Sequence, residues 1–332
     1  MTEVLVLHSD DIDGLATPKE YVDAVRDGYR QRGEGAPAAP RTKLPNSDPP
    51  GMLTSYVAIL PETGVMGGYT YSAGFGERDA WFTTPLFDAT TGEPIAILDG
   101  ASMNPFKTGA AGAVGVDALA RADADTVGLI GSGAQARGQL KATAAVRDLD
   151  HVRVFSPTKE HRESFAEGMA DDLGIDVDPV GSSTEAVRGS DVVITATTAS
   201  RPVFDGGELD PGTHVTAMGQ YDRKKRELDA ETILKSTYVP DLRERVTRDA
   251  GSFIHALDAG LVDRDHIHAE LGAIVAGNAP GRRSDEEITV FDSGGTAIET
   301  AAAGYLLYEK AREAGLGETV EFAPASEALT GE

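Results

Sequence analysis

The sequence predicts an α/β fold in which a doubly wound parallel sheet is inserted into a second, α+β domain. Three observations support this prediction. The chain has 332 residues, which is too long for one ordinary core of about 150 residues. Short β-rich segments alternate with helical segments only between 126 and 241. The two flanking regions follow other patterns, so we expect them to fold together as one discontinuous domain.

The region 126–241 is predicted to form the parallel sheet. Strands that alternate with helices of this length are typical of a doubly wound sheet. The segments "QARGQLKATAAVRDL" and "TKEHRESFAEGMADDLG" have apolar residues at helical spacing. The expected strands around them are "TVGLI", "HVRVFS", "IDVDPV", "DVVITATT", "HVTAMG" and "STYVPD".

The flanking regions are predicted to form the second domain. Near the N-terminus, the helix-like "TPKEYVDAVRDGYRQRGEG" is followed by a Pro-rich break and by extended segments such as "LTSYVAILP" and "GVMGGYTYSAGF". Near the C-terminus, "EITVFDSGGTAIETAAAGYLLYEKAREAG" is interpreted as a loop that opens a long amphipathic helix. The predicted boundaries are 1–120 and 246–332 for this domain, and 121–245 for the inserted domain.

Composition and charge exclude several classes of function. The chain has no cysteine, which excludes disulfides, thiolate zinc sites and cysteine nucleophiles. Aspartate and glutamate number 54 against 30 lysines and arginines, a formal net charge of −24. These dispersed acids argue against nucleic acid and anionic membranes as partners, and they fit a salt-rich cytoplasm that screens their repulsion. No apolar run approaches the ~20 residues of a membrane span, and no basic leader precedes "EVLVL", so we expect a soluble, cytoplasmic protein.

The most informative motif is "GSGAQA" at 131–136, between an expected strand and an expected helix. Gly131, Gly133 and Ala136 form a G-x-G-x-x-A pattern, which in this context places a pyrophosphate on the N-terminus of the helix. The first glycine allows the tight turn and the second allows close approach of the backbone. A plain strand-to-helix turn is the alternative, but the continuing strand–helix alternation favours a Rossmann-type domain that binds NAD or NADP.

The end of the second expected strand bears on the choice between NAD and NADP. An acidic residue at that position accepts a hydrogen bond from the ribose 2′-hydroxyl of NAD. Here the segment reads "VFSPTKEHR", with Ser156 and Thr158 in place of an acid and with Lys159 and Arg162 close behind. A 2′-phosphate would be tolerated, which slightly favours NADP. Solvated basic residues on the next helix explain the pattern equally well.

Four longer motifs extend the pattern along the chain: "PIAILDGASMNPFKTGAAGAVG", "LIGSGAQARGQL", "DVVITATTASRPVF" and "SDEEITVFDSGGTAIE". With these motifs the chain resembles the ornithine cyclodeaminase and mu-crystallin family, which also contains archaeal alanine dehydrogenase and ketimine reductases. The resemblance covers nearly the whole chain. It implies a homodimer whose NAD(P) domain is inserted between two halves of a substrate-binding and dimerisation domain. Together with the acidic composition, it indicates a halophilic archaeal member.

The resemblance also implies which residues bind the substrate. Family members grip the substrate carboxylate with an arginine, a lysine from a "G-V-K" strand and an arginine from "R-T-A-A". An aspartate after the fifth Rossmann strand assists the amine. Here Arg41 matches the first arginine and Lys107 replaces the second. Tyr69 stands in the place of the lysine, and Tyr221 in the place of the aspartate, with Asp222 one position later.

These groups have distinct expected roles. Arg41 and Lys107 are predicted to bind the carboxylate, and Asp222 to act as general acid or base. Tyr69 could donate a hydrogen bond or a proton, although its ordinary pKa of about 10 suits proton transfer less well than a lysine poised near neutrality. Core or pocket lining is the alternative for Tyr69. Lys43, two residues after Arg41, could supply the amine from a neighbouring strand position.

The remaining predicted site residues are expected to bind the cofactor, from the glycine loop, the strand ends and the loops beside them. They are Thr108, Gly131, Ser132, Gly133, Ala134, Gln135, Ser156, Thr158, Thr197, Thr198, Met218, Gly219, Ser293 and Gly294. No metal site is predicted, because His266 and His268 in "RDHIH" would point to different faces of a helix.

Three functions remain open at this point. The leading hypothesis is an NAD(P)-dependent oxidoreductase that transfers hydride at the α-carbon of a small amino acid or cyclic imino acid, as alanine dehydrogenase and ketimine reductases do. The second is ornithine cyclodeaminase, which forms proline and ammonia from ornithine with retained NAD. The third is a mu-crystallin-like cofactor-binding protein with little turnover. The missing lysine counts against the first two, and somewhat more against the cyclodeaminase.

Overall fold

The computed structural model describes residues 1–76 and 80–330. Its contacts divide the chain into two compact units, Met1–Asn104 with Thr296–Glu332, and Pro105–Gly295. The inserted unit thus begins before the predicted boundary at 121 and ends after the predicted boundary at 245. Helix α3 (Asn104–Leu119) and strand β13 (Thr289–Ser293) account for this difference, because nearly all of α3 and all of β13 lie in the inserted unit. Within the described residues, no helix has the length and apolarity needed to cross a bilayer.

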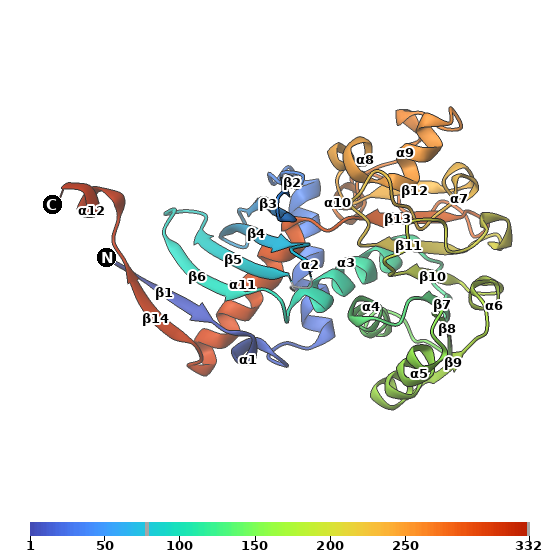
Figure 1. Cartoon of the computed structure of the whole chain (residues 1–332), viewed down its shortest axis with the longest axis horizontal. Coiled ribbons are helices and arrows are strands. Elements are labelled where there is room, and N and C mark those ends of the chain that lie inside the picture. The colour runs from blue at the N-terminus through green and yellow to red at the C-terminus, as the bar shows by residue number, and fades with distance from the viewer. Residues whose placement is uncertain (77–79, 331–332) are drawn as a thin grey trace. The chain divides into compact units, whose positions relative to one another are not determined.

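The first unit is a seven-stranded sheet with two long helices on one face. Its elements, in chain order, are β1 (Thr2–Leu7), α1 (Ser9–Ile12), α2 (Pro18–Gly33), β2 (Thr42–Ser47), β3 (Pro50–Leu60), β4 (Val65–Ala73), β5 (Trp81–Asp88), β6 (Pro94–Asp99), α11 (Ala297–Ala314), β14 (Glu318–Phe322) and α12 (Ala325–Thr330). The strand order is β14-β1-β6-β5-β4-β3-β2, and only β1 and β6 run parallel to each other. Helix α11 packs against α2 and against β3, β4 and β5 (Figure 1).

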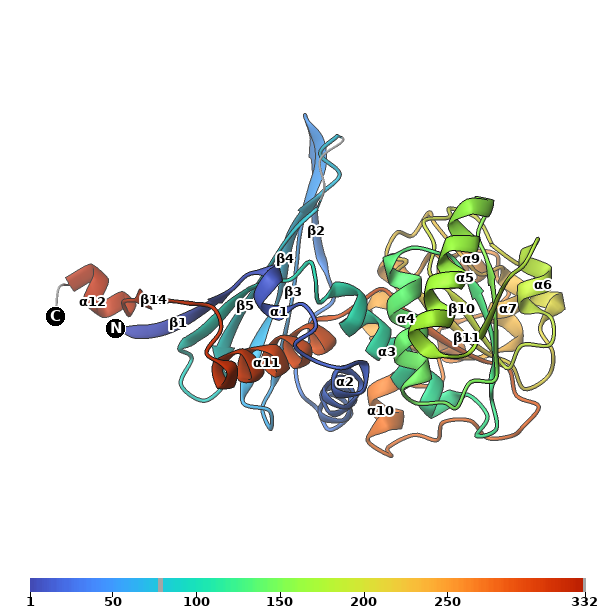
Figure 2. The same ribbon diagram turned by 90° about the horizontal axis from the view of Figure 1, so that it is seen from below.

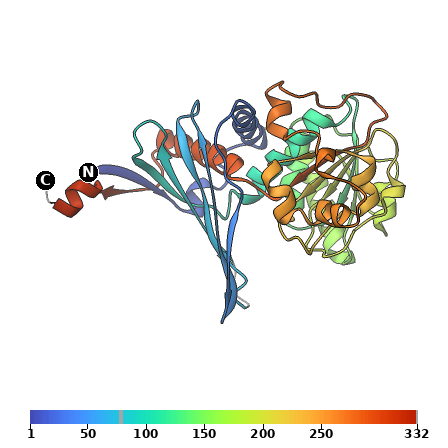
Figure 3. The same cartoon turned by 90° about the horizontal axis from the view of Figure 1, so that it is seen from above.

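The opposite face of this sheet carries apolar side chains that no described helix of the unit covers. Along β3, Tyr56 and Leu60 are buried, whereas the alternating Val57 and Ile59 are 55% and 36% exposed. Trp81 on β5 lies on the same face and is 73% exposed. Strand β2 and the adjoining ends of β3 and β4 project as a ribbon beyond the helices of the unit (Figures 2 and 3). Large apolar surfaces of this kind mark places of association.

The second unit is a seven-stranded, entirely parallel sheet. Besides α3 and β13, its elements are β7 (Thr126–Ile130), α4 (Ala134–Ala144), β8 (His151–Phe155), α5 (Lys159–Leu173), β9 (Asp176–Pro179), α6 (Ser183–Val187), β10 (Val192–Thr195), β11 (His214–Met218), α7 (Ala230–Lys235), β12 (Thr237–Pro240), α8 (Arg243–Asp249), α9 (Gly251–Asp258) and α10 (Leu271–Val275). The order is β12-β13-β11-β10-β7-β8-β9, so the winding reverses between β7 and β10. Sheets of this kind bind ligands at that reversal. The predicted fold class is confirmed.

Helix α3 belongs to the second unit because its small residues allow it to lie against α4. A Cβ atom on Gly109 would lie 2.2 Å from the carbonyl oxygen of Gly138, and one on Gly138 would lie 2.2 Å from that of Pro105. The buried Gln139 on α4 donates a hydrogen bond to the Thr108 carbonyl at 2.8 Å. Strand β13, which was expected to be part of a loop, pairs with both β11 and β12. These contacts place α3 and β13 with the parallel sheet of the second unit.

Candidate functional site

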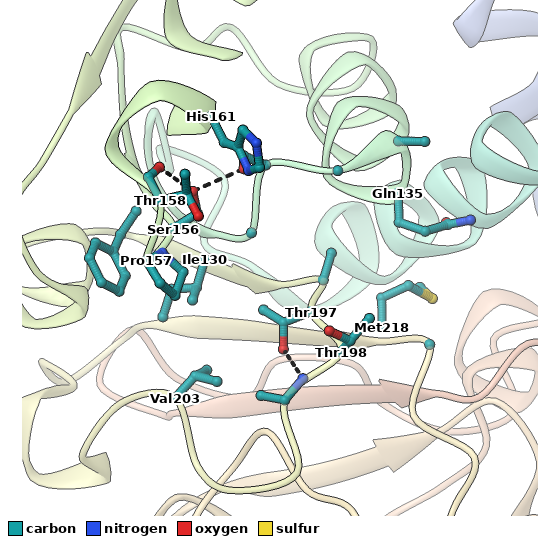
Figure 4. Close-up of a pocket in the computed structure, with 18 residues that line it drawn as sticks. Ile130, Gln135, Ser156, Pro157, Thr158, His161, Thr197, Thr198, Val203 and Met218 are labelled. Atoms are coloured by element: carbon teal, nitrogen blue, oxygen red, sulfur yellow. Dashed lines mark hydrogen bonds between the residues drawn. The ribbon is translucent and has the colours of Figure 1, made fainter. Parts of the chain in front are cut away.

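A cavity of about 850 Å³ opens at the carboxyl ends of β7, β8, β10 and β11, where the winding of the sheet reverses (Figure 4). A volume of this size is in the usual range for small-molecule sites, about 300–1,000 Å³. Among its lining residues are the predicted Gly131, Ser132, Gly133, Ala134, Gln135, Ser156, Thr158, Thr197, Thr198, Met218 and Gly219. The other predicted cofactor residues, Thr108, Ser293 and Gly294, do not line it.

The glycine loop forms the floor of the cavity. Gly131 has φ 121°, and a Cβ atom on it would lie 2.4 Å from the Ala196 carbonyl oxygen. Its amide donates to the Phe155 carbonyl at 2.9 Å, which fixes the turn between β7 and α4 against the end of β8. Gly133 is the N-cap of α4, and a Cβ atom there would meet nothing within 4 Å. The backbone therefore leaves open space at the start of a helix, where amide groups and the helix dipole favour an anion.

The end of β8 forms the wall beside the glycine loop. The Ser132 hydroxyl donates to the Ser156 hydroxyl at 2.9 Å, and Ser156 in turn contacts the Thr158 carbonyl at 3.4 Å. His161, on the first turn of α5, also lines the cavity (Figure 4). The Arg162 guanidinium donates to the Ser156 carbonyl at 3.0 Å. No acidic side chain lines this wall among the described residues, so hydroxyl and imidazole groups face a ligand bound here.

The segments after β10 and β11 form the facing wall. Thr197 and Thr198 line it from one segment, and Met218 and Gly219 from the other. The Gln220 side-chain amide, just after Gly219, donates to the Thr197 carbonyl at 3.2 Å. The two segments are thus fixed to each other by a side chain that does not itself line the cavity.

Glu227 lies beneath this wall with no exposed surface. Its Oε1 accepts the Thr197 amide at 2.7 Å, and its Oε2 accepts the Thr195 hydroxyl at 3.1 Å. Burial raises the pKa of the Glu227 carboxyl from 4.5 to about 7, and the charge of Asp292 adds to the rise, against the opposing effect of these hydrogen bonds. The wall therefore rests on a carboxyl group that titrates near neutral pH.

A second buried group, Arg245 on α8, supports the loop after β13. Its guanidinium donates to Asp241 and Asp292, each at 2.7 Å, and all three side chains are buried. Asp241 accepts the Ser293 hydroxyl at 2.8 Å, and the Ser293 carbonyl accepts the Gly219 amide at 2.8 Å. Ser293 was predicted to bind the cofactor. In the structure it holds Gly219, which lines the cavity.

Two of the predicted substrate residues of the first unit, Arg41 and Tyr69, belong to one aromatic cluster. The Arg41 guanidinium lies over the Tyr56 ring, 4.8 Å from its centroid, and Tyr56 meets the Tyr69 ring edge to face at 5.8 Å. The Tyr69 hydroxyl donates to the Gly100 carbonyl at 2.6 Å. Burial raises the pKa of Tyr69 well above its ordinary value. Lys43 lies on β2 and is exposed.

The predicted substrate residues of the second unit lie on two separate segments. Lys107 is on the first turn of α3, where it is buried and contacts the Thr108 hydroxyl at 3.4 Å. Asp222 is half-buried in the loop after Gly219, and its Oδ1 accepts the Lys224 amide at 3.0 Å. This hydrogen bond closes a turn that holds the Asp222 carboxyl in one direction. Asp222 lies four residues after Met218, the last residue of β11.

The cavity has the features needed for a dinucleotide cofactor. Gln135 Oε1 is buried and has no hydrogen-bond partner among the described residues, so a ligand donor would satisfy it. The open space at Gly133 and the α4 N-terminus would hold a pyrophosphate. The hydroxyls at the end of β8 would face a ribose, and the segments after β10 and β11 would hold the nicotinamide half.

The comparisons with known proteins agree with this geometry. The sequence model of the ornithine cyclodeaminase/mu-crystallin family matches residues 2–315. The chain belongs to the ornithine cyclodeaminase/mu-crystallin family. A relative within this family, a Δ1-pyrroline-2-carboxylate reductase of Bacillus cereus, is 36% identical over 267 residues, 80% of this chain and 79% of the relative.

Two solved structures of the ornithine cyclodeaminase/mu-crystallin fold are similar over nearly the whole chain. One is the Δ1-pyrroline-2-carboxylate reductase of Thermococcus litoralis in complex with NADH and L-proline, with a TM-score of 0.90, 36% identity, and 96% of this chain and 100% of that chain covered. The other is an archaeal alanine dehydrogenase dimer with bound NAD, with a TM-score of 0.90, 30% identity, and 97% and 100% covered. The predicted family is confirmed.

Sequence reasoning missed the residues that support the cavity from behind. Glu227 and Gln220 bond the wall directly, and Arg245 supports it through Asp292 and the loop after β13. These bonds join segments that are distant in sequence, so no local pattern reveals them. His161 was also missed, although it lies within the quoted "VFSPTKEHR". A polar side chain on the first helical turn after the second strand is the signal that could have identified it.

We predict that Glu227→Gln flattens the pH dependence of stability. The folded protein binds this proton more tightly than the unfolded chain, with a pKa of about 7 against 4.5. The resulting stabilisation is complete below pH 4.5 and is lost as the pH rises through 7. Between pH 5 and 8 the wild type should lose about 2.5 kcal/mol relative to the variant, measured as the free energy of urea unfolding.

The control for this experiment is Glu167→Gln, at an exposed position of α5. We expect its unfolding free energy to follow the wild type at each pH. Parallel curves for wild type and Glu227→Gln would show that Glu227 does not titrate in this range.

Proposed function

We propose that this protein transfers hydride between NAD(P)H and the α-carbon of a small amino acid or cyclic imino acid. The observation that carries the proposal is the cavity at the β7/β10 reversal, with its glycine loop and open helix N-terminus. The relatives from Bacillus cereus and Thermococcus litoralis support the same class of enzyme, because both are Δ1-pyrroline-2-carboxylate reductases. The relative from Thermococcus litoralis was solved with L-proline, which supports a cyclic imino acid as substrate.

The choice between NAD and NADP belongs to this proposal. The solved relatives hold NADH and NAD, which supports NAD(H). The wall at the end of β8 presents Ser156, Thr158 and His161 and no described acid, which leaves room for a 2′-phosphate. Arg162 is within reach of the same wall. We therefore propose that the site accepts both cofactors, with a slight preference for NADP(H).

The charge of the substrate and the proton that the reaction consumes indicate which residues the site needs. When bound, the reduced nicotinamide supplies a hydride to the α-carbon of the C=N bond, and the imine nitrogen takes up one proton. Arg41 and Lys107 are proposed to bind the substrate carboxylate, one as a planar fork and the other as a point charge. Asp222 is proposed to hold and deliver the proton.

Tyr69 and Lys43 have weaker claims to a role in catalysis. The Tyr69 hydroxyl donates to Gly100 and is buried, so we propose that it shapes the site and does not deliver a proton. Lys43 is exposed on β2, on the ribbon that projects beyond the helices of its unit. We propose the Lys43 side chain as the alternative source of the amine that the family resemblance leads one to expect at position 69.

The function is tested by an absorbance assay in molar salt. Purified protein is mixed with NADH or NADPH and with a panel of cyclic imino acids, or of 2-oxo acids with ammonia. We expect the reduced-nicotinamide absorbance to fall with at least one substrate, and with both cofactors. Asp222→Asn should lower kcat at least about 100-fold, because a positioned acid or base contributes that much, while the Kd for the reduced cofactor stays unchanged. The control Asp171→Asn, at an exposed position of α5, should keep wild-type kcat.

Each other outcome assigns a different function. Release of proline and ammonia from ornithine without a net absorbance change would identify a cyclodeaminase with retained NAD. Cofactor binding without turnover on either panel would identify a mu-crystallin-like binding protein. Full turnover by Asp222→Asn would show that another group moves the proton.

We further propose that the protein is a homodimer joined through the open face of the first sheet. The relative solved as an alanine dehydrogenase dimer supports this state. So does the apolar face that carries Leu53, Val57 and Ile59 on β3 and Trp81 on β5, which a second copy would remove from water.

Val57→Glu tests the dimer, since it places a charge in the middle of this face. We expect a wild-type mass of about twice 34.8 kDa by light scattering, and a dimer dissociation constant at least about 100-fold higher for the variant. Leu261→Glu changes an equally exposed leucine, 47% against 55% for Val57, in the second unit and should leave the mass unchanged. A monomeric wild type would contradict the proposal.

A halophilic archaeal origin and a cytoplasmic location remain proposals that rest on composition. The net charge of −24 gives strong self-repulsion at low ionic strength. The thermal unfolding midpoint should therefore rise by several degrees between about 0.1 M and molar KCl, as the Debye length falls from about 10 Å to about 3 Å. Sucrose at equal osmolality is the control for solvent exclusion. A midpoint that does not rise in salt would contradict the adaptation.

A further inference from the structure

Glu227 supports the cavity wall at two points of the segment that follows β10. Its carboxyl oxygens accept the Thr197 amide at 2.7 Å and the Thr195 hydroxyl at 3.1 Å. Its own carbonyl accepts the Val203 amide at 2.9 Å. Thr197 and Val203 both line the cavity. One buried residue therefore fixes the backbone at the start and at the end of the segment that follows β10.

The loop after β11, which contains Glu227, makes a second contact with Thr197. Gln220 donates to the Thr197 carbonyl at 3.2 Å, while Glu227 accepts the amide of the same residue. Both peptide groups of Thr197 are therefore bonded to one loop, which begins at Gly219 in the cavity itself. A shift of Glu227 must move Thr197 and the surface that it presents to a ligand.

The charge of Glu227 has no cation to offset it among the described residues that bond to its carboxyl. Those partners, Thr195 and Thr197, are neutral. The titratable group that acts on it from another element is Asp292 on β13, and Asp292 is itself paired with Arg245 at 2.7 Å. An ionised Glu227 thus places an uncompensated negative charge in a buried, poorly polarisable region, where its field extends further than in water.

This charge lies on the nicotinamide side of the cavity. The pyrophosphate position at the α4 N-terminus and the ribose position at the end of β8 assign the adenine half to one side. The segments after β10 and β11 are left for the nicotinamide half, which is positively charged in the oxidised cofactor and neutral in the reduced one. A carboxylate under this wall interacts more favourably with the oxidised form.

We propose that Glu227 is a positioning residue of the nucleotide site whose negative charge raises the affinity for oxidised relative to reduced cofactor. The proposal rests on the proposed NAD(P) function. Glu227 then has two effects that different substitutions separate. Its hydrogen bonds set the overall affinity for the cofactor, and its charge sets the ratio of the affinities for the oxidised and reduced forms. A bound reduced cofactor is then a stronger hydride donor than the free one, which favours reduction of an imine.

The test measures Kd for NADH and NAD⁺ by isothermal titration calorimetry from pH 5.5 to 8.5 in the wild type, Glu227→Gln and Glu227→Ala. In the wild type, Kd(NADH)/Kd(NAD⁺) should rise about fivefold as the pH passes 7. Glu227→Gln keeps an acceptor for Thr197 but carries no charge, so the ratio should stay constant at its low-pH value with near-wild-type Kd for NADH. Glu227→Ala loses both contacts and should weaken both cofactors at least tenfold.

The control variant is Asp229→Asn. Asp229 is two residues further along and also bonds backbone amides, those of Thr232 and Gly206, but neither residue lines the cavity. It should keep the wild-type ratio and its pH dependence, even where its unfolding midpoint falls. Any pH effect that does not come from the Glu227 carboxyl persists in Glu227→Gln and is subtracted.

The outcomes separate this inference from the function on which it rests. If the wild type binds neither NAD(H) nor NADP(H), the proposed function fails. If the wild type binds and Glu227→Gln shows the same ratio and pH dependence, the function stands and the role of the Glu227 charge is overturned. If Glu227→Ala binds both cofactors like the wild type, its positioning role is overturned as well.

Discussion

The candidate site depends on how closely the backbone after β7 approaches the backbone after β10. At Gly131 the separation leaves no room for a side chain, since a Cβ atom would lie 2.4 Å from the Ala196 carbonyl oxygen. Its φ of 121° is also unfavourable for other residues. This contact brings the α4 N-terminus and the Thr197 segment to opposite walls of one cavity. A larger residue would separate the strand ends and widen the cavity before any ligand bound.

Buried charges fix the rest of this cavity, and they do so in two different ways. Asp241 and Asp292 are paired with the buried Arg245, and Asp241 also accepts the Ser293 hydroxyl, so the loop at Ser293 is held in place. Glu227 has only neutral hydrogen-bond partners on the wall, and burial raises its pKa to about 7. The Glu227 arrangement responds to a change of pH, and it lies beneath residues that line the cavity.

The sequence predicts the local features well and the distant contacts poorly. The glycine loop, the strands of the parallel sheet and the hydroxyl residues at the strand ends are encoded in short stretches, and the structure has them where the pattern places them. The unit boundaries differ because α3 is held by backbone contacts at Gly109 and Gly138, which leave no amphipathic pattern. Strand β13 differs because its partners, β11 and β12, are remote in sequence. Glu227 and Arg245 were missed for the same reason.

Several neighbours together hold Tyr69 in its position. Tyr69 replaces the lysine that the family resemblance leads one to expect, and its hydroxyl bonds the Gly100 carbonyl at 2.6 Å. A Cβ atom on Gly100 would lie 2.3 Å from the Tyr69 ring, so the tyrosine requires the glycine. The Tyr56 ring meets Tyr69 edge to face and carries Arg41 on its own face.

A lysine at position 69 would therefore lose the bond to Gly100 and the ring contact with Tyr56. Burial also raises the pKa of Tyr69, which makes it a poorer acid than a free phenol. Tyr69 is thus a rigid aromatic support for Tyr56, whose ring carries Arg41. If Arg41 binds the substrate carboxylate as proposed, this support limits its orientations, and the proton for the imine nitrogen comes from another group, Asp222 in the leading proposal or Lys43 as the alternative.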